Sequence, residues 1–130
     1  MRRGAAVVEF AAVVPVLLMF VLGMIEIGRA IMVSEILAHV AGTGARYAVL
    51  ETSTTAAVTA DVRKRLADSG IKGATVTVLV GGAAGEIKGA TTGTEVAVLV
   101  AVPYASVSWA SGGTYLRGKT LSGRCSMRHE

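Results

Sequence analysis

The chain has few of the residues that build covalent, metal or nucleic-acid sites. It has one cysteine, Cys125, so no disulfide can form within the chain. Two histidines and this cysteine are too few for a closed zinc site, and no metal or other cofactor is expected. Six aromatic residues and scattered basic ones do not make a base-stacking surface, so the net charge of +4 does not predict nucleic-acid binding. No nucleophile, base and orienting group occur together, and we expect no enzyme.

Charged residues are also scarce, and they are nearly absent from the N-terminal part of the chain. Residues 10–25 read FAAVVPVLLMFVLGMI, and residues 4–25 contain one charge, Glu9. At about 1.5 Å per residue, residues 5–25 are long enough to cross a hydrocarbon core of about 30 Å. The sequence therefore predicts a single transmembrane helix over residues 5–25.

The flanking charges predict the orientation of this helix. Arg2 and Arg3 precede it, whereas Glu26 is the first charge after it. The positive-inside rule therefore places the N-terminus in the cytoplasm and the C-terminal domain outside. A cleaved secretory signal fits less well, because Arg29 and bulky side chains follow where a cleavage site needs small ones. Glu9 is unexplained by a simple anchor, since a carboxylate near the middle of a membrane helix costs ~2.5–3.5 kcal/mol.

The helical pattern continues beyond the predicted membrane segment. Apolar residues keep helical spacing to about residue 50, which predicts one helix over residues 5–50 whose second half, residues 26–50, is a stalk. Glu26 and Arg29 lie three positions apart and are expected to form an ion pair at the outer membrane face, with a contact to a partner subunit as the alternative. The apolar side of the stalk is expected to comprise Ile27, Ile31, Leu37, Val40 and Ala41.

Residues 51–130 are expected to form a small exported domain. Val58, Val62 and Leu66 form an apolar stripe in a second, short helix that ends near Gly70. Residues 74–80, 95–102 and 119–128 alternate and predict a three-stranded antiparallel sheet. The fold class is therefore α+β, with the stalk and the short helix on one face of the sheet. The expected inward-facing residues are Val76, Val78, Val80, Val96, Val98, Val100, Val102, Leu121, Cys125 and Met127.

One stretch, GTYLRGKT at residues 113–120, satisfies the phosphate-loop pattern G-x-x-x-x-G-K-[ST]. A phosphate loop joins a buried strand to a helix whose N-terminus receives the phosphates. Here the alternating residues LSGRCSMR follow, and no later strand supplies a magnesium-binding aspartate. We therefore interpret this stretch as a loop that leads into the final strand.

Three segments in order resemble one protein family. They are RRGAAVVEF with a proline at Pro15, GMIEIGRA at residues 23–30, and GARYAV at residues 44–49. The first resembles the N-terminus of a type IV prepilin, and the three together resemble the TadE-like pseudopilins, or minor pilins, of tight-adherence (Tad) pilus systems. The motif residues, with a role in assembly, are Phe10, Pro15, Gly23, Glu26, Gly28, Arg29, Gly44, Arg46 and Tyr47.

The resemblance implies a processed membrane protein of a pilus system. Residues 1–4 would be a leader that a prepilin peptidase removes after Gly4, which leaves Ala5 as the new N-terminus. Glu9 would then pair with the Ala5 ammonium group of a neighbouring subunit. The implied partners are the lipid bilayer, the peptidase, other pilin or pseudopilin subunits and the Tad assembly platform, and the implied location is the bacterial inner membrane. The alternative is an uncleaved single-pass envelope protein whose extracytoplasmic domain binds a ligand.

Overall fold

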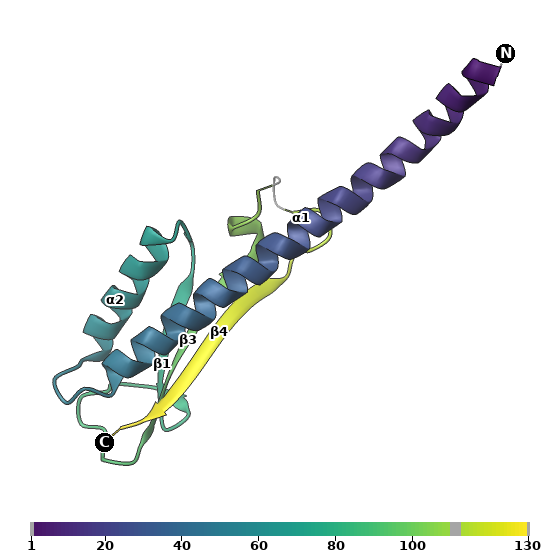
Figure 1. Cartoon of the computed structure of the whole chain (residues 1–130). Helices are drawn as coiled ribbons and strands as arrows, with labels where there is room; N and C mark the ends of the chain where they lie inside the picture. Colours follow the sequence, from purple (N-terminus) through teal and green to yellow (C-terminus); the bar gives the residue numbers. More distant parts are fainter. Residues whose placement is uncertain (1, 110–112, 130) are drawn as a thin grey trace.

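The computed structural model describes residues 2–109 and 113–129, and it has the predicted α+β architecture. Figure 1 shows a long first helix whose N-terminal half projects alone, while its C-terminal half crosses the sheet beside the second helix. The elements are α1 (Arg2–Ala48), α2 (Thr55–Asp68), β1 (Thr75–Val80), β2 (Ala83–Ala84), β3 (Glu95–Pro103), the 3-10 helix η1 (Tyr104–Ser106) and β4 (Thr120–Arg128).

The sheet is antiparallel, with strand order β2-β1-β3-β4. The three predicted strands are confirmed to within a residue or two, and Val98 on β3 pairs with Val78 on β1 and with Cys125 on β4. The sheet has a fourth strand that the sequence did not predict. This strand, β2, has only two residues inside the glycine-rich loop, too few to show an alternating pattern.

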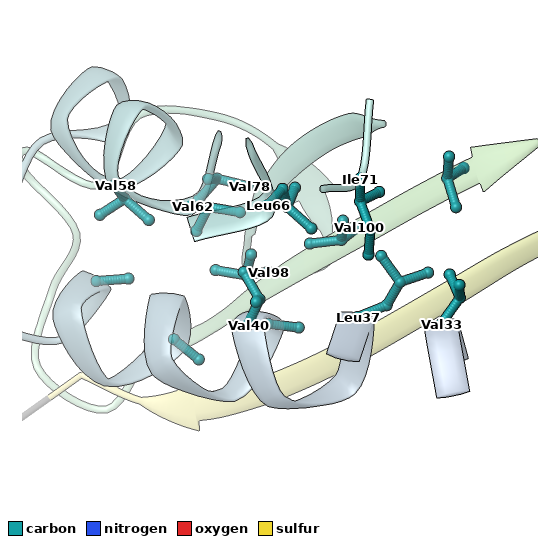
Figure 2. Close-up of a cluster of buried hydrophobic side chains, with 14 of the residues drawn as sticks. Val33, Leu37, Val40, Val58, Val62, Leu66, Ile71, Val78, Val98 and Val100 are labelled. Atoms are coloured by element: carbon teal, nitrogen blue, oxygen red, sulfur yellow. The ribbon is translucent and has the colours of Figure 1, made fainter. Parts of the chain in front are cut away.

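Both helices pack on one face of the sheet and form a single hydrophobic core with it. Figure 2 shows side chains of α1 and α2 converging on valines of β1 and β3. A small sheet buries little apolar area by itself, and the second half of α1, the predicted stalk, supplies much of the core from its expected place on one face of the sheet. The buried residues of the two helices are Val33, Leu37, Val40, Ala41, Ala45 and Ala48 on α1 and Val58, Val62 and Leu66 on α2.

The predicted inward-facing strand residues all contact this core, but to different depths. The central positions Val78, Val96, Val98, Val100 and Val102 are buried. The others are only half-buried, because they lie toward strand ends or on the edge strand β4; they are Val76, Val80, Leu121, Cys125 and Met127.

The expected apolar side of α1 was partly wrong. Leu37, Val40 and Ala41 are buried, but Ile27 and Ile31 are each 55% exposed. The side of α1 that faces the domain includes Glu26 and Ala30, which immediately precede the two isoleucines. Because successive residues of an α-helix are turned by about 100°, Ile27 and Ile31 point away from that side. The two isoleucines therefore remain on an uncovered side of the helix.

The helix α1 lies directly against the backbone of strand β4. A Cβ atom added at Gly123 would lie 2.5 Å from the carbonyl carbon of Leu37 and 2.6 Å from the nitrogen of Ala38. These distances are far shorter than a carbon contact of about 3.5–4.0 Å. Only glycine permits this approach, which fixes where α1 crosses the sheet.

Candidate functional site

The N-terminal half of α1 is apolar and uncovered. A stretch of 18 residues in this helix is strongly apolar with at most two charged residues, and none of it is buried within the chain. The large side chains from Val7 to Ile25 are between 40% and 70% exposed, except Val14, which is partly covered. Exposing such a run to water is costly, which favours an apolar environment for this part of the helix. It is consistent with a single membrane span or a signal.

The residues of the predicted processing site lie on this projecting segment. Gly4, Ala5, Glu9 and Phe10 are all exposed, and α1 continues without a break through Pro15. Within residues 2–109 and 113–129, the Glu9 carboxylate has neither a hydrogen bond nor an ion pair. A single copy of the chain therefore supplies no counter-charge to Glu9 in its described part, and the pair predicted between subunits stays a prediction.

Glu26, by contrast, is buried and its carboxylate is fully engaged. Oε1 accepts a hydrogen bond from the backbone N–H of Thr114, and Oε2 accepts from the backbone N–H groups of Tyr115 (2.8 Å) and Leu116 (3.2 Å). The Tyr104 hydroxyl donates to the Glu26 backbone carbonyl at 3.1 Å. We call Glu26 with the N–H groups of residues 114–116 the carboxylate cradle. It ties α1 to the loop before β4.

The cradle favours the ionised form of Glu26. Burial of the carboxyl group raises its pKa, but the backbone N–H groups of Thr114, Tyr115 and Leu116 outweigh that effect and hold the pKa below its ordinary value of 4.5. Hydrogen bonds from N–H groups to a carboxylate are stronger than those to a neutral carboxyl group. Glu26 is therefore a charged group held in place by backbone dipoles.

The predicted ion pair between Glu26 and Arg29 is wrong. Arg29 Nε donates to the backbone carbonyl of Val107 at 2.9 Å, and its guanidinium lies 5.0 Å from the centroid of the Trp109 ring. Three backbone donors satisfy the Glu26 carboxylate better than one guanidinium would, because an ion pair three positions apart on a helix adds only about 0.2–0.5 kcal/mol. Both side chains instead connect α1 to the segment around η1 and β4.

The cradle also explains the phosphate-loop pattern at residues 113–120. The N–H groups of Thr114, Tyr115 and Leu116 do bind an anion, but that anion is the chain's own Glu26. The prediction that a strand follows is confirmed, since β4 begins at Thr120. Sequence reasoning missed these donors. The signal that could have indicated them was the phosphate-loop pattern, because glycine-rich turns with free N–H groups bind anions.

Two motif glycines on α1 have different surroundings near the cradle. A Cβ atom added at Gly23 would lie 3.5 Å from the Tyr115 ring, so this glycine faces the loop. The Tyr115 hydroxyl donates to the backbone carbonyl of Met19 at 3.0 Å, which fixes the ring along the helix. Gly28 has nothing within 4 Å of an added Cβ atom. Gly23 therefore has a packing role, and Gly28 lies on a free surface.

The third motif segment lies at the other end of α1. Gly44 is buried, and a Cβ atom there would be 2.6 Å from a methyl group of Val62 on α2. Tyr47 is half-buried and packs against the core, whereas Arg46 is exposed. Gly44 thus brings the two helices together, and Arg46 remains available to another molecule.

The contact at Gly44 makes a matched pair of variants possible. Gly44→Ala should lower the free energy of unfolding by ~1–3 kcal/mol, because the added methyl group overlaps Val62. Gly42→Ala should instead raise it by up to ~1 kcal/mol, because open space surrounds that position in the same helix. Thermal unfolding in detergent, followed by circular dichroism, measures both; equal effects of the two substitutions would contradict the packing at Gly44.

The remaining candidate groups are dispersed. Cys125 is half-buried with a free thiol, and His39 is exposed on α1. Among residues 2–109 and 113–129, no three histidine, cysteine or acidic side chains are placed to hold a metal ion together.

The comparisons with known proteins agree with the resemblance of the N-terminal segments. Residues 4–46 match the family model described as TadE-like protein. This match includes every predicted processing, charge-pair and motif residue except Tyr47. The comparisons with curated proteins and with solved structures gave no match. The chain therefore carries a TadE-like family domain at its N-terminus, over residues 4–46.

Proposed function

We propose that this chain is a membrane-inserted pseudopilin, or minor pilin, that takes part in the assembly of a Tad-type pilus. The observation that carries the proposal is the coincidence of the TadE-like match with the exposed apolar half of α1. The family has a Tad pilus context, and pilin-like proteins are not known as enzymes. An apolar helix that projects from its own domain is suited to packing in a membrane and, later, among other helices.

The proposed topology follows from the charges around this helix. Residues 5–25 span the inner membrane, with the basic N-terminus in the cytoplasm. Residues 26–50 and 51–130 form the exported part, and the shared core makes these two segments one folded unit.

Processing is the second part of the proposal. A prepilin peptidase removes residues 1–4 after Gly4, and the Ala5 ammonium group is created at the start of the span. Glu9 lies four residues further on, about 6 Å along the helix. A neighbouring subunit displaced along the pilus axis brings its own Ala5 ammonium to this carboxylate. Such a pair offsets the cost of a lone carboxylate in low dielectric, and it favours one stagger between subunits.

Surface-exposed motif residues are the proposed contacts with other subunits and with the assembly platform. Phe10 and Pro15 lie on the projecting segment, and Gly28 and Arg46 lie on the uncovered parts of α1. None of these four residues belongs to the core of the domain. Their place in the family segments is better accounted for by assembly than by folding.

Deletion and complementation test this proposal in a strain that encodes the chain and makes Tad pili. Deletion should abolish or strongly reduce surface pili and adhesion, and the wild-type chain supplied from a plasmid should restore both. If pili form normally in the deletion strain, the chain is an anchored envelope protein with some other task. Membrane insertion, checked in the same cells by resistance to alkaline extraction, is expected in either case.

A further inference from the structure

Two aromatic rings lie beside α1 at the outer end of the proposed membrane span. Trp109 is 68% exposed and is held over the Arg29 guanidinium, while Tyr115 is 49% exposed. The Tyr115 hydroxyl bonds to the carbonyl of Met19, seven residues before Glu26 and thus about 10 Å further toward the N-terminus along the helix. The Tyr115 ring therefore lies alongside residues that belong to the span.

We infer that these residues dock the exported domain on the outer surface of the phospholipid bilayer. The inference rests on the proposed membrane insertion. We call Trp109, Tyr115 and Arg29 the aromatic anchor. Trp109 and Arg29 lie at the level of the lipid headgroups, and Tyr115 reaches into the upper part of the acyl chains. The domain then sits on the membrane with a fixed height and orientation.

The chemistry of the aromatic anchor suits this environment. Tryptophan and tyrosine are enriched at the boundary between headgroups and hydrocarbon, where one edge of the ring is polar and the rest apolar. Tyr115 lines an open, largely apolar groove along α1, which an acyl chain can fill without leaving polar groups unpaired. The residues of α1 that line this groove are Val16, Met19, Phe20, Gly23, Met24 and Ile27.

The charge near the aromatic anchor complements lipid phosphate. Residues 104–121 contain Arg117 and Lys119 and no acidic residue, and both cationic side chains are exposed. Arg29 adds a third positive charge, and the one acidic group close by, Glu26, is enclosed by its cradle. Basic residues near a bilayer surface are attracted to anionic lipids.

The carboxylate cradle removes the main objection to placing a loop at membrane depth. Backbone N–H groups outside helices and sheets are costly in hydrocarbon unless they have internal partners. The N–H groups of Thr114, Tyr115 and Leu116 are all bonded to Glu26. The loop can therefore lie against the membrane without exposing unpaired donors at these three positions.

The chain offers a direct probe, because Trp109 is its only tryptophan. The full-length protein is reconstituted into phosphatidylethanolamine–phosphatidylglycerol vesicles that contain lipids brominated at one of two depths. Bromine near the glycerol end of the acyl chains should quench Trp109 emission strongly, and bromine near the methyl ends should quench it much less. In a Trp109→Phe/Tyr115→Trp variant, the more deeply placed bromine should quench the tryptophan emission more strongly than it quenches Trp109 in the wild-type protein.

A matched variant supplies the control. Trp109→Phe/Leu50→Trp moves the probe beyond the far end of α1, about 35 Å along the helix from residue 25, where Leu50 is 52% exposed. Its emission should be unaffected by bromine at either depth. If the wild-type protein resists alkaline extraction from the vesicles but Trp109 is not quenched, the docking is wrong and membrane insertion stands. If the protein is extracted, insertion itself fails, and the proposed function fails with it.

Discussion

Glu26→Gln should release the loop before β4 from α1. The glutamine side chain keeps the size of glutamate but loses the charge. Its NH₂ group cannot accept hydrogen bonds, so one amide oxygen at most remains as the acceptor for the three backbone N–H groups. Amide hydrogens of Thr114, Tyr115 and Leu116 should exchange faster by about tenfold or more, since each lost bond to a charged group shifts the opening equilibrium by at least that factor. Hydrogen–deuterium exchange with mass spectrometry measures this.

The control for this substitution is Glu35→Gln, which removes an exposed carboxylate from the same helix. It should leave exchange in the loop unchanged. Equal exchange in the parent and in Glu26→Gln would mean that the carboxylate cradle does not hold the loop.

The same bonds predict how the loop responds to pH. Because the folded state lowers the pKa of Glu26, the stability that the cradle contributes is fully present above the ordinary value of 4.5 and is lost as the pH falls through the lower, folded value. Protection of the loop amides from exchange in the parent should therefore be constant at pH values above 4.5 and should decline in more acidic solution. Glu26→Gln should show no such decline, because it has no proton to gain at this position.

Glu9→Gln should block assembly while leaving insertion intact. The substitution keeps the shape and hydrogen-bonding capacity of the side chain but removes the charge, so membrane insertion should persist or improve. Cleavage should also persist if the peptidase reads mainly Gly4 and the basic leader. Crosslinking to other pilin subunits should fall by about tenfold or more, because the ammonium of the neighbouring Ala5 is left uncompensated in low dielectric.

Two observations make this test specific to Glu9. Its side chain is exposed on the projecting half of α1 and bonds to no other group in the described part of the chain, so the substitution removes no internal contact. Glu35→Gln again serves as the control and should assemble normally. Glu26→Gln is unsuitable as a control, because it disturbs the domain itself. Normal crosslinking and adhesion of Glu9→Gln would require another explanation for a carboxylate at this position.

Much of the fold was predictable because its elements have strong local patterns. The two helices, the three long strands and the central valines of β3 follow from helical spacing, alternation and the glycines between segments. The register of α1 on β4 was not predictable, since it depends on Gly123 meeting the backbone of Leu37. No local pattern states which distant residue a glycine will approach.

The candidate site shows the same division between local and long-range information. The Gly4, Ala5 and Glu9 spacing is local and could be read from the chain, as could the apolar run around it. The partners of Glu26 could not, because the backbone N–H groups of Thr114 and Tyr115 lie almost 90 residues away and have no sequence signature of their own. A charged residue three positions away, Arg29, therefore suggested an ion pair that the fold does not form.

Intact-mass measurement of the chain from pilus-forming cells tests the central claim, a processed pilin-like subunit, most directly. In cells with an active prepilin peptidase, the account predicts a chain that begins at Ala5 and lacks the mass of Met1, Arg2, Arg3 and Gly4. Gly4→Leu, measured in parallel, should keep the leader, because the peptidase no longer finds its glycine. Recovery of the wild-type chain at full length from such cells would contradict the account and leave an uncleaved membrane anchor in its place.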